Sequence, residues 1–299
     1  MAGEAKTLVV VAGPTASGKT DCALDLALKL DTEILSFDSR QFYREMCIGT
    51  AVPSLEVQQQ VPHHFIQHIS IHEPYDVARY EEAAISKLEM LFNHNDVVVA
   101  VGGSGLFIHA LMYGLDKLPE ADERLREELA TQWKEEGPGP MLDELKASDP
   151  QYYDAVDKAN PRRVMRALEV IRMTGKPFSA FRSGNKVTRP FRILPYALDI
   201  DRALLHGRIA ARTDEMLNLG LVNEAEQLYP YRHLNALKTV GYQEIFSFLD
   251  GDISLSTARE KIIINTRRYA RRQITWFRRD VAFEWISPEK ILDRALSCL

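Results

Sequence analysis

The sequence has little cysteine and no long apolar run, and both absences limit what the protein can be. Its three cysteines, Cys22, Cys47 and Cys298, show no CxxC spacing and no accompanying histidine pattern. A zinc site or a disulfide framework is therefore not expected, and a reducing cytoplasm fits this use of cysteine. No apolar run approaches the length that spans a bilayer, so no membrane association is expected. The N-terminus also lacks the basic-then-apolar pattern of a signal peptide.

An excess of positive charge is lacking too, because 37 Lys and Arg stand against 42 Asp and Glu. The charge is nevertheless unevenly distributed. Residues 116–157 carry 13 acidic and 5 basic side chains, residues 158–192 carry 10 basic side chains and one acid, and residues 267–279 carry 6 arginines and no acid. Two concentrated basic stretches make nucleic acid a candidate partner despite the net charge of −5.

A glycine-rich loop near the N-terminus is the most specific local motif. It fits G-x-x-x-x-G-K-[ST] with Gly13, Pro14, Thr15, Ala16, Ser17, Gly18, Lys19 and Thr20. Residues 7–12 before it predict a buried strand and residues 20–29 after it predict a helix, the context that a phosphate-binding loop requires. Backbone N–H groups would meet phosphate oxygens, Lys19 would reach the terminal phosphates and the Thr20 hydroxyl would ligate Mg²⁺. The alternative is a chance match in a glycine turn.

Alternating strand and helix patterns predict an α/β fold, a P-loop-type parallel sheet flanked by helices. Further strands are predicted at 33–37, 96–101, 192–198 and 281–285, and helices over about 201–279. Sheet character stops after Tyr113, and the next stretch is helical and strongly charged. We therefore expect a catalytic core of residues 1–113 and 190–299, with residues 114–189 forming an inserted, mobile helical subdomain. Asn160, Pro161 and Gly175 mark the ends of one of its helices.

Two polar side chains follow the predicted strands. Because the carboxyl ends of parallel strands share one edge of a sheet, Asp38, Ser104 and the phosphate loop should line one crevice. An NTPase usually ends a neighbouring strand with an Asp that holds Mg²⁺, whereas the strand 96–101 runs into Gly102-Gly103-Ser104. This absence argues against an ordinary NTPase. Simple helix caps are the alternative for Asp38 and Ser104.

The run 267–279 predicts a basic helix. Its inward stripe would consist of Ile263, Ala270, Ile274 and Phe277, with two rows of arginines beside it. A solvated surface is the alternative, although such a surface normally includes acids. Unpaired arginines near Trp276 favour a polyphosphate backbone as the partner.

Taken together, these segments resemble the tRNA dimethylallyltransferase family, also called tRNA isopentenyltransferase. The resemblance rests on six stretches in the family's order across nearly the whole chain: Gly13–Thr20, Asp38–Pro53, Val101–Leu106, Asn160–Pro177, Val240–Glu244 and Thr266–Arg278. It implies transfer of a dimethylallyl group from dimethylallyl diphosphate to N6 of adenine 37 in tRNA. The loop would then cradle the diphosphate rather than ATP, with Mg²⁺. Nothing in the sequence indicates an obligate protein partner.

The resemblance also implies roles for individual residues. Asp38 would accept the N6 proton, and Ser104, which stands where the family commonly has threonine, would retain the hydroxyl. Arg212 is a candidate diphosphate contact. The implied tRNA-binding residues are Asp38, Ser39, Arg40, Gln41, Arg126, Arg162, Arg163, Val164, Met165, Arg166, Lys238, Thr239, Val240, Gly241, Tyr242, Gln243, Arg271, Arg272, Gln273, Trp276 and Arg278.

Three other functions stay open. A P-loop small-molecule kinase would use ATP and leaves the arginine rows without a role. A transferase that prenylates free AMP would not need a tRNA-binding insert. A non-catalytic RNA-binding ATPase is disfavoured by the missing carboxylate at the end of the strand 96–101.

Overall fold

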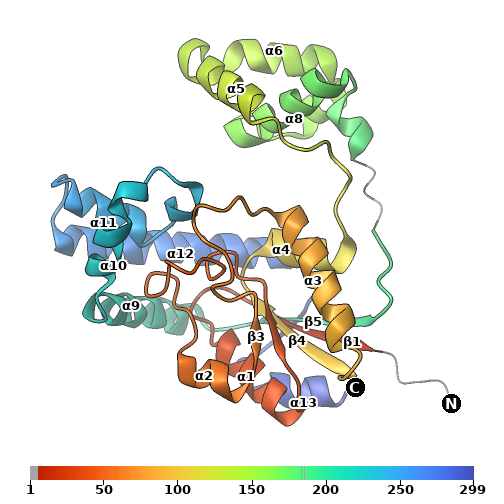
Figure 1. Cartoon of the computed structure of the whole chain (residues 1–299), viewed down its shortest axis with the longest axis vertical. Coiled ribbons are helices and arrows are strands. Elements are labelled where there is room, and N and C mark those ends of the chain that lie inside the picture. Colours follow the sequence, from red (N-terminus) through yellow and green to blue (C-terminus); the bar gives the residue numbers. More distant parts are fainter. Residues whose placement is uncertain (1–5, 183, 185) are drawn as a thin grey trace. The chain divides into compact units, whose positions relative to one another are not determined.

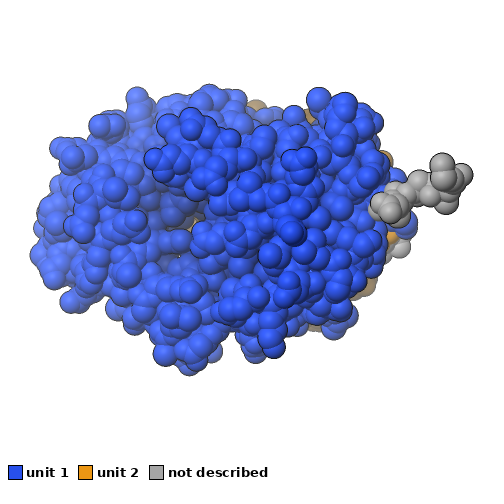
Figure 2. Space-filling view, turned by 90° about the horizontal axis from the view of Figure 1, so that it is seen from below, with its two compact units in different colours: residues 1–113, 188–299 blue, residues 114–187 orange. Residues whose placement is uncertain are grey.

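The computed structural model describes residues 6–182, 184 and 186–299 (Figure 1). The chain divides into two compact units, which Figure 2 colours separately. Unit 1 comprises residues 1–113 and 188–299, and unit 2 comprises residues 114–187. In the described ranges, no helix is both long enough and apolar enough to cross a membrane.

Unit 1 is built on a parallel sheet with the strand order β3-β2-β4-β1-β5-β6. Every pair of neighbouring strands runs in the same direction. The strands are β1 (Thr7–Ala12), β2 (Ile34–Ser36), β3 (His63–His64), β4 (Val97–Gly102), β5 (Arg192–Leu198) and β6 (Glu284–Ile286). The predicted α/β fold with a parallel, helix-flanked sheet is therefore confirmed.

Helices cover both faces of this sheet. Along β1, Val9 and Val11 pack with residues of α1 and α13, whereas Leu8 and Val10 belong to the larger cluster formed with α3, α4 and α12. Figure 1 shows α1 and α13 together on one side of the strands. The helices of unit 1 are α1 (Lys19–Lys29), α2 (Leu55–Gln60), α3 (Val77–Leu91), α4 (Gly105–Tyr113), α9 (Arg202–Asn218), α10 (Leu221–Leu228), α11 (Tyr242–Leu249), α12 (Leu255–Arg279) and α13 (Ile291–Leu296).

Unit 2 is helical and has its own apolar core, which includes Leu129, Met141 and Leu168. Its helices are α5 (Glu123–Glu136), α6 (Pro138–Ser148), α7 (Pro150–Ala155) and α8 (Pro161–Thr174). The ends of α8 lie where the sequence predicts them. The Asn160 side chain accepts the Arg163 N–H, and Gly175 ends the helix with φ 67°, a left-handed conformation that glycine adopts without strain.

The predicted closing strand 281–285 is shifted in the structure. A turn occupies residues 280–283, where the Asp280 carboxylate accepts the Ala282 N–H and the Asp280 carbonyl accepts the Phe283 N–H. This turn delays pairing with β5 until Glu284. The strand therefore begins three residues later than the sequence predicts, at Glu284, and ends at Ile286.

Candidate active site

The phosphate loop joins β1 to α1, and two of its residues have left-handed backbone angles. Ala16 has φ 63° and Gly18 has φ 88°. Alternation of such angles with right-handed ones turns successive N–H groups toward one concavity, which is how backbone amides bind anions. The methyl group of Ala16 packs against Leu205 and Ile209 of α9, which helps to hold a conformation that costs a non-glycine residue free energy. The loop is thus built as an anion site.

Lys19 begins α1 and is buried, with 9% of its surface exposed. Its Nζ donates to the Pro14 carbonyl at 3.3 Å. Burial lowers the pKa of Lys19 from 10.5 to about 8; Asp38 opposes this lowering and Arg212 adds to it. A cation that burial penalises in this way gains free energy when an anion reaches it. Lys19 is therefore a buried cation that an anion in this pocket would stabilise.

Two arginines of α9 reach the same loop. Arg212 Nη1 lies 3.5 Å from Thr15 Oγ1, and Arg208 Nη1 donates to the Ser17 carbonyl at 3.2 Å. Burial lowers the pKa of Arg212, and Glu215 and Asp38 oppose that shift. Arg212 and the phosphate loop line one pocket. The sequence analysis did not predict that Arg208 contacts the phosphate loop. Its position one helical turn before Arg212 could have indicated this, because residues four apart share one face of a helix.

The pocket gathers residues from three strand ends. It is lined by Thr15, Ala16, Gly18, Lys19, Thr20, Asp21, Asp38, Gln41, Thr50, Ala51, Val101, Gly102 and Arg212. The expected crevice is present in part: the phosphate loop, Asp38 and Gly102 line it, whereas Ser104 is not among its lining residues. Asp38 does not cap a helix: its carboxylate accepts the Arg40 N–H in a tight turn, and the next helix begins only at Leu55.

The Ser104 hydroxyl forms hydrogen bonds with Ser39, in the segment after β2, rather than with its own helix α4. Its Oγ accepts the Ser39 N–H at 3.0 Å and lies 3.0 Å from the Ser39 hydroxyl. Tyr269 of α12 also lies close to Ser104. Burial raises the pKa of Tyr269 to about 12; Asp38 adds to the rise, whereas Arg40, Arg272 and a hydrogen bond with Ser104 oppose it. Tyr269 therefore stays a neutral phenol beside Asp38 and Ser104, a neighbour that the sequence analysis missed because arginines flank it.

The segment 47–51 forms another part of the pocket wall, and the partly buried carboxylate of Glu224 holds it in place. Glu224 of α10 accepts the backbone N–H groups of residues 47, 48 and 49 at 2.7–3.0 Å. Tyr242 donates its hydroxyl to the same carboxylate at 2.6 Å and is fully buried. Burial, with the charge of Glu224, raises the pKa of Tyr242 far above its usual value. The Val240–Glu244 motif thus supports the pocket wall, and within it Gln243 is exposed.

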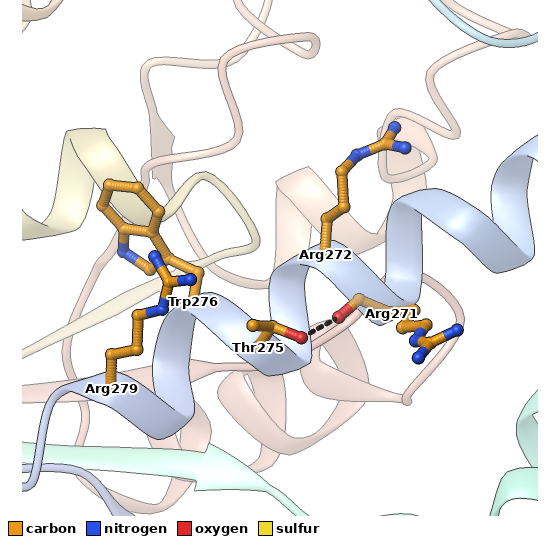
Figure 3. A pocket seen from close by; sticks show the side chains of 5 residues that line it. All are labelled: Arg271, Arg272, Thr275, Trp276 and Arg279. Atoms are coloured by element: carbon orange, nitrogen blue, oxygen red, sulfur yellow. Dashed lines mark hydrogen bonds between the residues drawn. The ribbon is translucent and has the colours of Figure 1, made fainter. Parts of the chain in front are cut away.

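The outer face of α12 carries the predicted arginines. A surface pocket is lined by Arg271, Arg272, Thr275, Trp276 and Arg279, and in Figure 3 Arg279 extends toward the Trp276 ring. In the described part of the chain, none of the six arginines at 267–279 forms an ion pair. Trp276 lies against the start of α4, because a Cβ at Gly105 would be 2.1 Å from its ring. This places the cationic face next to Ser104.

The remaining tRNA-binding candidates differ in exposure. Arg162 and Arg163 on α8 are exposed, as is Lys238, whereas Val164 is buried in the core of unit 2. Arg126 and Arg166 both pair with the carboxylate of Glu169, at 3.0 Å and 2.8 Å. Glu169 is only 1% exposed, so these two arginines neutralise a buried acid.

The pocket offers oxygen ligands that suit Mg²⁺. The protein supplies the Thr20 hydroxyl, and a bound diphosphate would supply further oxygens. Over the described ranges, no group of three or more His, Cys, Asp or Glu side chains could hold a metal ion. Because Mg²⁺ commonly takes one or two protein ligands together with substrate phosphates, this donor set fits an ion that binds with a diphosphate.

Comparison with known proteins gives one consistent result. The model of the family described as IPP transferase matches residues 41–280. A tRNA dimethylallyltransferase of Christiangramia forsetii is 48% identical over 278 residues, which cover 93% of this chain and 92% of that one. The tRNA dimethylallyltransferase 1 of Bacteroides fragilis is 46% identical over 286 residues, covering 96% and 95%. Among solved structures, the tRNA isopentenylpyrophosphate transferase of Bacillus halodurans is similar with a TM-score of 0.71 and 34% identity, covering 98% of this chain and 93% of that chain.

Proposed function

The chain belongs to the IPP transferase family and is a tRNA dimethylallyltransferase, and from this premise we propose how its residues carry out the reaction. The donor is dimethylallyl diphosphate and the acceptor is N6 of adenine 37 in tRNA. The observation that carries this proposal is one pocket in which the phosphate loop, Lys19 and Arg212 face the carboxylate of Asp38. Anion-binding groups and a base are thus brought together. A tRNA substrate is consistent with action in the cytoplasm.

The phosphate loop and its cations bind the diphosphate of the donor. Residues 13–20 supply backbone amides, Lys19 supplies a buried cation, and Arg212 approaches from α9. As the bond between the allylic carbon and the diphosphate oxygen breaks, the electron pair leaves with the diphosphate. Donors that are already in place stabilise that developing charge without reorganisation. Mg²⁺, held by Thr20 and the diphosphate, would supply further charge neutralisation.

Asp38 is the general base. As N6 forms its bond to the allylic carbon, one N6 proton passes to the Asp38 carboxylate, so the product amine is neutral. Removal of that proton is needed because the N6 lone pair is delocalised into the adenine ring, and a positioned base contributes about 10²–10⁴ in rate. Tyr269 lies near both Asp38 and Ser104, and the hydroxyl groups of Tyr269 and Ser104 act as donors toward the reacting groups.

The tRNA is held by exposed cations on both units. On unit 1 these cations are Arg271, Arg272, Arg278 and Lys238, and on unit 2 they are Arg162 and Arg163. The exposed Trp276 and Gln243 and the partly buried Arg40, Gln41 and Met165 complete the proposed tRNA contacts. Val164, Tyr242 and Gln273 are buried and support these surfaces. An adenine inside an anticodon loop must leave its stack to reach a pocket, and an extensive basic surface offsets that cost.

One assay tests this function. Labelled dimethylallyl diphosphate is incubated with the protein and either bulk tRNA, free AMP or no acceptor, with ATP-dependent phosphoryl transfer measured in parallel. We expect label in tRNA and no requirement for ATP hydrolysis. Label in AMP with an efficiency equal to that of tRNA would support the free-nucleotide transferase instead. Phosphoryl transfer from ATP without prenylated tRNA would support a kinase.

A further inference from the structure

Gln273 lies inside the arginine-rich stretch of α12 but does not share its exposure. The side chain is 5% exposed, whereas the neighbouring Arg271 and Arg272 are exposed. Its Oε1 accepts the Thr15 N–H at 2.9 Å, and its Nε2 donates to the Gly103 carbonyl at 2.9 Å. Because a backbone N–H only donates and a carbonyl only accepts, these partners determine which end of the amide is oxygen.

The space around this amide is filled. A Cβ at Gly103 would lie 2.2 Å from Gln273 Nε2 and 3.2 Å from the Gly13 carbonyl oxygen. The phosphate loop, the turn after β4 and α12 therefore meet around a single side chain, and only glycine at position 103 leaves room for it. Neither partner of the amide belongs to α12 itself.

The contact has a consequence for the loop. Thr15 precedes Ala16, the residue with the left-handed backbone angle, so the bond from Gln273 holds the loop where its direction changes. The Thr15 N–H is used by Gln273, which leaves the amides at the start of α1 to face a phosphate. Any displacement of α12 would reach the anion site through this bond.

We propose that Gln273 is a positioning residue through which α12, the helix that presents arginines to tRNA, holds the phosphate loop in its diphosphate-binding shape. This inference rests on the proposed function for the identity of the two substrates. It differs from the sequence-based expectation that Gln273 contacts tRNA. The Thr15 N–H needs an acceptor and the Gly103 carbonyl needs a donor, and the amide of Gln273 supplies both. This explains why a glutamine occurs within a run of arginines.

The first test compares Gln273→Met with Lys261→Met, a matched substitution at an exposed position of the same helix. Binding of inorganic diphosphate and of tRNA is titrated separately, and KM and kcat are measured for the donor. We expect Gln273→Met to weaken diphosphate binding by about 5–30-fold, to raise the donor KM similarly and to change tRNA affinity less than about twofold. Lys261→Met should change none of these values. Weaker tRNA binding with unchanged diphosphate binding would overturn the proposal.

A second variant tests the same contact from the other side. Gly103→Ala should displace the amide without altering residue 273, and it should reproduce the loss of diphosphate affinity. Because both changes break one contact, the double variant Gly103→Ala/Gln273→Met should bind diphosphate no more than about twofold worse than the weaker single variant. Fully additive losses would show that the two residues act separately and would overturn the proposal.

A measurement on the unmodified protein covers the case in which the variants do not fold. Amide hydrogen exchange should show the Thr15 N–H protected in the free protein, with diphosphate adding protection at Lys19 and Thr20 but not at Thr15. Rapid exchange at Thr15 that slows only with diphosphate would refute the proposal. If wild-type protein transfers no label to tRNA, the proposed function fails, whereas the diphosphate titration still decides the role of Gln273.

Discussion

The buried charge of Lys19 makes a quantitative prediction about pH. Burial lowers the pKa of Lys19 from 10.5 to about 8, so the free site loses this cation as the pH rises through 8. A bound diphosphate favours the protonated amine and raises its pKa. Diphosphate binding should therefore take up a proton above pH 8 and weaken as the solution becomes more basic.

The size of the effect follows from the lowered pKa. With a pKa of about 8, roughly 90% of Lys19 is charged at pH 7 and roughly 10% at pH 9, so diphosphate affinity should fall about tenfold across this range. At pH 8.5 binding should take up about 0.8 proton per site. The unfolded chain binds more protons than the folded one between pH 8 and 10.5, so Lys19 makes the free energy of unfolding of the ligand-free protein rise with pH in this window.

Calorimetry at constant ionic strength measures both quantities. Titration of dimethylallyl diphosphate at pH 7, 8 and 9 gives the affinity, and repetition at pH 8.5 in buffers with different ionisation enthalpies gives the proton uptake. Lys19→Met is the control. In this variant the ligand can still ionise but residue 19 cannot, so any remaining pH dependence of binding does not come from the Lys19 amine. The same pH dependence in wild type and Lys19→Met would refute the argument.

Three further predictions concern other parts of the site. Asp38→Asn should lower kcat by about 10²–10⁴ while the tRNA Kd changes only a few-fold, and normal single-turnover rates in the folded variant would exclude Asp38 as the base. Replacing Arg271 and Arg278 together with Gln should reduce the slope of log affinity for tRNA against log salt by about 1–2, and an unchanged slope would mean that these arginines are only solvated. Tyr242→Phe removes the hydroxyl from Glu224, which should cost about 1 kcal/mol in a denaturant titration and raise the donor KM. A weaker tRNA Kd for Tyr242→Phe, with unchanged stability and donor KM, would instead place this residue against the RNA.

Sequence reasoning was most successful where the relevant residues are neighbours in the chain. The phosphate loop, β5 and both ends of α8 depend on short-range patterns, namely a glycine turn, an apolar run and capping residues. The parallel sheet followed from helices that separate the strands. The two-residue strand β3 had no such signal, because two histidines are too short a run to show alternation.

What the sequence alone determined about this protein is therefore its class of fold, the glycine-rich loop between β1 and α1 and the edge of the sheet at which this loop meets Asp38. Only the tertiary structure decided which polar groups support that site. Gln273 meets Thr15 across 258 residues of chain, and Glu224 meets Ile48 across 176. Periodicity predicts which face of a helix is buried, but it carries no information about the backbone groups that this face will meet. A glutamine among arginines therefore looks like part of a surface in the sequence, and the fold makes it a support for the phosphate loop.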